Sequence, residues 1–215
     1  MSGYRRPAIP NQEFRDAAGH VIHYGSQWGE AGPAESAYSV DSHPERFAPL
    51  HEVADAIISD LMLRHDVERD DDPDVGGDLL RPFADVVRAV RLTPAAPDAA
   101  PLTFVFTSYP GLAIHAGLLT DFSYPVCGCD ACDETWESTA DELEWQAFAV
   151  TRGLFRETVA QGRSPGVGFS LAAADGSSRM AGEHGAADVP ANRLAAAADQ
   201  LRGLPDAWRP WPLRH

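Results

Sequence analysis

The sequence contains no lysine, because all 17 of its basic residues are arginine. Without lysine the chain can form neither a Walker-type phosphate-binding loop nor a Schiff base with a substrate carbonyl. Acidic residues outnumber basic ones by 32 to 17, which gives a formal net charge of −15. Because a charge of this sign and size repels phosphate groups and anionic lipids, we expect no nucleic-acid partner and no docking on a membrane.

Long apolar runs are also absent. No stretch reaches the roughly eighteen apolar residues that a membrane-spanning helix requires. Arg5 and Arg6 are not followed by an apolar segment, so we expect no secretory signal. Cysteine is scarce: the 3 cysteines all lie between positions 127 and 132, and an odd number packed so closely does not build a disulfide framework. These features predict a cytoplasmic protein with reduced thiols.

The first 48 residues are rich in proline, glycine, serine and aromatic residues, which predicts an extended segment that wraps the protein surface. Within it, Phe14–Tyr24 predicts two short strands around an Asp-Ala-Ala-Gly turn. Ser42 and Glu45 have the spacing of a capping box ahead of a helix. We therefore expect residues 1–48 to form an N-terminal wrap with a short hairpin, followed by an α+β domain over residues 49–215, in a chain that is a single domain overall.

The remainder of the chain predicts helices and strands in an order typical of an α+β fold. The clearest helix is Pro49–Arg64, where apolar residues recur every three or four positions. Further helices are predicted over 135–152, with Gly153 as its stop, and over 190–201. Strands are predicted over 86–92, 102–109, 112–118, 122–126, 167–173 and 178–181, with an acidic loop over 68–78. Because helices and strands do not alternate, we expect an antiparallel sheet with helices packed mainly on one face.

The most informative segment is Pro125-Val-Cys-Gly-Cys-Asp-Ala-Cys-Asp-Glu134, which holds every cysteine of the chain. Cys129 and Cys132 have C-x-x-C spacing, which lets one turn present two thiolates to a tetrahedral ion. Cys127 can supply a third thiolate, because Gly128 relaxes the backbone beside it. A predicted helix follows, and its N-terminus favours the thiolate form of the ligands. Since thiolates are soft ligands, we expect the metal to be zinc.

Three thiolates leave one position of a tetrahedral site open. We expect His115 to fill it, because His115 lies in the strand before the turn and an antiparallel return could bring it near Cys127. The alternatives are local carboxylates or more distant histidines: Asp130, Asp133, His20, His23, His43 and His51. A closed site with four protein ligands would be structural, whereas an open site would hold water and could support hydrolysis.

Several segments resemble a family of uncharacterised actinobacterial proteins, a domain of unknown function. The resemblance rests on His43–Leu50, Tyr109–Leu112, Pro125–Glu134, Ala174–Ser177 and the Trp-Arg-Pro-Trp-Pro run near the C-terminus, and the cysteine run is its most specific element. It implies a bacterial cytoplasmic protein, and it supplies neither an activity nor a metal.

The residues themselves favour a metal-stapled α+β protein with a structural role or a role in binding an unidentified protein or small-molecule partner. One alternative is a zinc-dependent enzyme with an open, thiolate-ligated site. Another is a small-molecule-binding domain whose thiols are inert. A redox role for the C-x-x-C pair is less favoured, because Asp133 and Glu134 oppose thiolate formation beside it.

Overall fold

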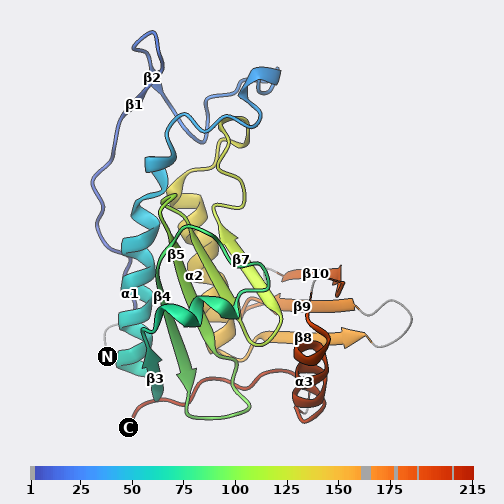
Figure 1. Cartoon of the computed structure of the whole chain (residues 1–215). Coiled ribbons are helices and arrows are strands. Elements are labelled where there is room, and N and C mark those ends of the chain that lie inside the picture. Colours follow the sequence, from blue (N-terminus) through green and yellow to red (C-terminus); the bar gives the residue numbers. More distant parts are fainter. Residues whose placement is uncertain (1–2, 161–165, 177–178, 188, 205) are drawn as a thin grey trace.

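The computed structural model describes residues 3–160, 166–176, 179–187, 189–204 and 206–215. These residues form α-helices and antiparallel sheets (Figure 1), so the predicted α+β class is confirmed. Within the described ranges, no helix combines the length and the apolar character that crossing a membrane requires.

The larger of the two main sheets is antiparallel and has five strands in the order β3-β4-β5-β6-β7. The strands are β3 (Val67–Asp70), β4 (Val86–Pro94), β5 (Leu102–Thr107), β6 (Leu112–Ala116) and β7 (Thr120–Tyr124). The last four confirm predicted strands. Strand β3 is a correction, because it takes up the start of the predicted acidic loop. Asp70 pairs there with Arg91 of β4, and opposite charges on neighbouring strands favour such pairing.

Two long helices cover one face of this sheet (Figure 1), as predicted. Helices α1 (Pro49–Arg64) and α2 (Trp136–Thr151) bury their apolar stripes against alternate residues of the strands, such as Phe104. A short 3-10 helix, η3 (Pro73–Asp78), lies over the opposite face, where Val75 belongs to a smaller apolar cluster. The helical cover is therefore mainly on one face, and η3 supplies the lesser cover on the other.

A second antiparallel sheet, with strand order β10-β9-β8, follows α2. Its strands are β8 (Phe155–Ala160), β9 (Gly166–Ala172) and β10 (Arg179–Gly185). The β9–β10 hairpin was predicted, although Ser178 lies outside the described residues, whereas β8 was not. Helix α3 (Ala191–Arg202), which was predicted, packs beside β8. The C-terminal segment then returns along the body and buries Trp208 and Trp211.

The N-terminal segment (residues 3–48) contains the predicted hairpin, with β1 (Phe14–Arg15) paired to β2 (Val21–Ile22). Two 3-10 helices follow, η1 (Glu35–Ala37) and η2 (Pro44–Phe47). The predicted capping box is wrong. No side chain caps η2, because the hydroxyl group of Ser42 donates instead to the carboxylate of Asp130 in the cysteine segment.

Candidate metal centre

The cysteine turn (residues 125–134) connects the end of β7 to the start of α2, and its middle forms the 3-10 helix η4 (Asp130–Cys132). The Sγ atoms of Cys127 and Cys129 are 3.3 Å apart, and those of Cys129 and Cys132 are 3.5 Å apart. All three Sγ atoms lie within 4.8 Å of one another. The structure therefore brings the three predicted cysteines together into a group that could hold a metal ion.

The three thiols are free and differ in exposure: Cys129 is buried, Cys127 is half-buried and Cys132 is exposed. Hydrogen bonds from the Cys127 thiol and from the backbone N–H of Cys132 lower the pKa of Cys129 to about 7. Hydrogen bonds between Cys132 and the sulfurs of Cys127 and Cys129 raise the pKa of Cys132 to about 12. Hence the three thiols do not all ionise together near neutral pH without a cation, whereas a bound metal ion would deprotonate them.

Asp133, directly after the last cysteine, fastens the N-terminal segment to the turn. Its backbone is left-handed, with φ of 55°, and its side chain points back toward the segment's backbone. One carboxylate oxygen accepts the N–H of Gly25 at 2.8 Å, and the other accepts the N–H of Gln27 at 3.1 Å. A residue between the three cysteines and α2 thus holds a part of the chain more than a hundred positions away.

Asp130, between the second and third cysteines, makes a further set of contacts to the same segment. Its carbonyl oxygen accepts hydrogen bonds from the side chains of Gln27 and Trp28, both at 3.0 Å. Its carboxylate accepts the N–H of Ser42 at 3.2 Å, and its own N–H donates to the carbonyl of Val40 at 2.7 Å. The cysteine turn is therefore the place where both ends of the stretch from Gln27 to Ser42 are anchored.

Arg46 completes this junction from η2. Its side chain is only 2% exposed and lies 3.8 Å from the carboxylate of Asp130, which balances its charge. Its guanidinium group donates to the carbonyls of Gly128 at 2.7 Å and His43 at 3.0 Å. It also stacks on the ring of Tyr24, 4.2 Å from the ring centroid. Sequence reasoning missed this residue, because no spacing pattern marks one buried arginine among seventeen.

Glu134 and Thr135 fix the other side of the turn, at the start of α2. The carboxylate of Glu134 accepts the N–H groups of Cys127 at 3.0 Å and Val126 at 3.3 Å. The hydroxyl of Thr135 accepts the N–H of Ser138 at 3.2 Å and so caps the helix. These hydrogen bonds hold the turn at both ends and so keep the three cysteines close together.

His115, the predicted fourth ligand, lies elsewhere. Its Nδ1 atom is 2.6 Å from the carboxylate of Asp121, and its Nε2 atom is 3.2 Å from the guanidinium of Arg193. Because arginine only donates, Nε2 must accept, and Nδ1 carries the proton toward Asp121. The β6–β7 hairpin pairs His115 with Asp121 near its turn, whereas Cys127 follows the far end of β7. The antiparallel return therefore carries the cysteines away from His115.

The alternative ligands are also engaged away from the sulfurs. Asp130 and Asp133 hold the N-terminal segment, and His43 contacts Glu45 and the carbonyl of Arg15. His51 contacts the carbonyl of Gly111, His20 contacts Asp16, and His23 is exposed in the loop after β2. Among the residues that the structure describes, the group of possible metal ligands contains the three cysteines alone.

The fold and this turn define an α+β protein with a three-cysteine candidate metal centre. Residues 10–215 match the model of a family of unknown function, DUF6226, and the chain belongs to this family. No curated protein and no solved structure matches the chain. The match includes both the cysteine turn and most of the N-terminal segment docked on it, and the description of the family names no activity. The function must therefore be argued from the site.

Proposed function

We propose that the protein binds one zinc ion through Cys127, Cys129 and Cys132, and that this metal stabilises the junction between the N-terminal segment and the body of the fold. The observation that carries the proposal is the convergence of three thiols, all within 4.8 Å, in the turn on which that segment is anchored. We place the protein in the cytoplasm of a bacterium, where the thiols would stay reduced.

The spacing of the sulfurs supports zinc. With Zn–S bonds of about 2.3 Å, a tetrahedral site separates its sulfur atoms by about 3.8 Å. The distances of 3.3 Å and 3.5 Å are slightly shorter than that value, and the third is at most 4.8 Å. Only small movements of the side chains would admit the ion. Thiolates are soft ligands that favour zinc over magnesium or calcium.

A structural role is supported by what the turn holds. The N-terminal segment has short strands and 3-10 helices, and its contacts with the turn are made largely through hydrogen bonds to Asp130 and Asp133. These two residues alternate with the cysteines, so a change in the shape of the metal loop would displace the groups that bind the segment. Zinc would fix that shape, because three metal–sulfur bonds would replace the weak hydrogen bonds among the thiols.

The fourth coordination position supports partner binding as part of the same role. Cys132 is exposed, so a zinc ion beside it would face solvent. Water, or a side chain of a bound protein, would complete the tetrahedron there. This openness also favours a second candidate, an enzyme that uses zinc-bound water. The structural role is preferred, because three thiolates donate enough charge to weaken the Lewis acidity of zinc.

Metal analysis of the purified, reduced protein tests the proposal. We expect one equivalent of zinc per chain, and we expect Cys129→Ser to lose most of it. Asp133→Asn is the matched variant: it keeps all three thiols, so it should keep zinc, although it removes a carboxylate that binds Gly25 and Gln27.

Limited digestion by a glutamate-specific protease provides the second readout. Glu30 and Glu35 lie in the stretch that the turn anchors, so cleavage there should accelerate in Cys129→Ser and after chelation of the wild type. A reduced protein that neither contains zinc nor takes it up on titration would refute metal binding. A protein that loses zinc with unchanged cleavage would refute the structural role, and would leave the zinc-water enzyme as the better candidate.

A further inference from the structure

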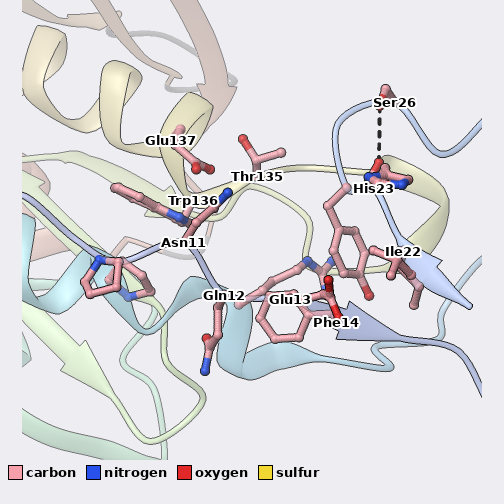
Figure 2. A pocket seen from close by; sticks show the side chains of 15 residues that line it. Asn11, Gln12, Glu13, Phe14, Ile22, His23, Ser26, Thr135, Trp136 and Glu137 are labelled. Atoms are coloured by element: carbon pink, nitrogen blue, oxygen red, sulfur yellow. Dashed lines mark hydrogen bonds between the residues drawn. The ribbon is translucent and has the colours of Figure 1, made fainter. Parts of the chain in front are cut away.

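A cavity of about 510 Å³ lies between the N-terminal segment and the first turn of α2. Figure 2 shows Thr135, Trp136 and Glu137 on one side and Glu13, Phe14 and Ile22 on another. This volume falls in the range of small-molecule sites. The cavity is separate from the three sulfurs, so its occupancy is a question beyond the proposed metal function.

The charged groups on the cavity wall favour a cation. Glu13 and Glu137 contribute carboxylates. The carboxylate of Glu137 has no hydrogen-bond or ion-pair partner among the residues that the structure describes. The lining contains the exposed His23 and the arginine Arg46, and Arg46 is 2% exposed and committed to Asp130 and to backbone carbonyls. An anionic ligand would thus meet unpaired negative charge without an available arginine.

The start of α2 adds a positive end of a helix dipole, which by itself favours an anion. That end carries about half of an elementary charge, and its influence falls off within one turn. The carboxylate of Glu13 is paired with Arg15, so the Glu137 carboxylate supplies the unpaired full negative charge on this wall, and the whole chain has a net charge of −15. The full charge of Glu137 therefore outweighs the half charge of the dipole in the cavity.

Besides the carboxylate, the cavity wall has aromatic rings, whose faces attract cations. Trp136, Phe14 and Tyr24 line the cavity and are each half-buried, so part of each side chain stays accessible. The ring of Tyr24 already carries a cation, the Arg46 guanidinium at 4.2 Å, and Trp136 offers the largest π-face among the three. An indole face and an unpaired carboxylate on the wall of one cavity are suited to an ammonium group.

We infer that this cavity binds a small organic cation, consisting of a primary or quaternary ammonium group on an apolar body. The ammonium group would lie at the Glu137 carboxylate beside the indole of Trp136. The apolar body would lie toward Phe14 and Ile22, on the part of the wall formed by the β1–β2 hairpin. Binding involves no covalent step.

Calorimetric titration of the full chain with three probes tests the inference. The probes are 2-phenylethylamine, its neutral analogue 2-phenylethanol and its anionic analogue phenylacetate. We expect saturable binding of the amine with a dissociation constant of about 1 mM or below. The alcohol and the carboxylate should bind at least about threefold more weakly, because they lack the attraction to the carboxylate and the ring.

Two variants locate the site, and one serves as a control. Glu137→Gln and Trp136→Leu should each weaken amine binding by about threefold or more. Glu68→Gln removes an exposed carboxylate from β3, outside the cavity, and should leave binding unchanged. Glu137→Gln also keeps the result interpretable if Trp136→Leu disturbs α2.

Three results would overturn the inference. They are no saturable binding of the amine up to about 10 mM, equal binding of the amine and the alcohol, or amine affinity unaffected by Glu137→Gln. None of them bears on zinc content, which is measured separately, so a failure here is distinguishable from a failure of the metal proposal.

Discussion

Gly117, in the turn between β6 and β7, lies against a buried carboxylate and should tolerate no side chain. Its φ is +67°, and a Cβ atom there would overlap Oε2 of Glu157 and come within 3.0 Å of the Phe155 ring. Glu157 is 5% exposed, and Oε2 accepts the N–H of Leu118 and the indole N–H of Trp208, both at 3.0 Å. A methyl group at Gly117 must therefore displace the acceptor of two buried donors.

The expected cost of Gly117→Ala follows from these contacts. An alanine in left-handed backbone costs about 1–2 kcal/mol. Hydrogen bonds to a charged acceptor contribute about 1.5–3 kcal/mol each, and two of them are at risk. Partial relaxation of the turn would recover part of that energy. We therefore expect the free energy of unfolding to fall by about 4 kcal/mol, a large share of the roughly 5–15 kcal/mol typical of a domain.

Gly176→Ala is the matched control. Gly176 has a φ of +72°, but a Cβ atom there meets nothing within 4 Å, so only the backbone cost of about 1–2 kcal/mol applies. Urea unfolding followed by tryptophan fluorescence reports both variants, because Trp208 and Trp211 are buried in the native protein. Equal losses in the two variants would show that the carboxylate of Glu157 does not sit against the turn, and would refute the reasoning.

Two further predictions concern buried charges. Arg46→Met leaves the carbonyls of His43 and Gly128 without their donor, so we expect the free energy of unfolding to fall by about 3 kcal/mol and protease cleavage of the N-terminal segment to accelerate. The control is Arg156→Met at an exposed position, which should lower the free energy of unfolding by less than about 0.5 kcal/mol. Similar losses in the two variants would contradict the contacts assigned to Arg46. At Asp78, burial raises the pKa, but hydrogen bonds from Arg91 and Thr103 outweigh it and hold the pKa below its usual 3.8. A group with a lowered pKa stabilises the folded protein at pH values above its unfolded-state pKa, and this stability is lost as the pH falls through the folded-state pKa. Asp78→Asn should therefore flatten the decline of the unfolding free energy below about pH 4. The same decline in the variant and the wild type would contradict the role assigned to Asp78.

Much of the secondary structure could be predicted from local patterns. Helix α1 has an apolar stripe wide enough to mark both its ends and its buried face, and Gly153 marks the end of α2. Strand β8 was missed, because the adjacent charged residues Arg156 and Glu157 interrupt the alternation of apolar and polar residues, and because its partner strand lies after it. Strand β3 was missed because its acidic residues suggest a loop until Arg91 is known to lie opposite. The proposed boundary at residue 49 stays a prediction.

In the candidate site, features set by residues close together in the sequence could be predicted, whereas features set by the packing of distant segments could not. The three cysteines lie within six positions, so their meeting depends on one turn, and the spacing predicted it correctly. The fourth ligand depends on the register of a hairpin. Because strand pairing places His115 opposite Asp121, the hairpin carries Cys127 away from it. Nothing in the order of residues reveals that register, nor that Asp130 and Asp133 would bind a segment a hundred positions earlier.

The arrangement of the turn also limits what a metal could contribute. A metal present at a thousand times its dissociation constant stabilises the state that binds it by about 4 kcal/mol. Fixing the backbone costs about 1–2 kcal/mol for each residue, so zinc alone could not order the stretch from Gln27 to Ser42. The hydrogen bonds to Asp130 and Asp133, the burial of Trp28 and the Arg46 contacts must contribute most of the docking energy. Zinc would then act on cooperativity, because it holds both aspartates in the one geometry in which all of these contacts form together.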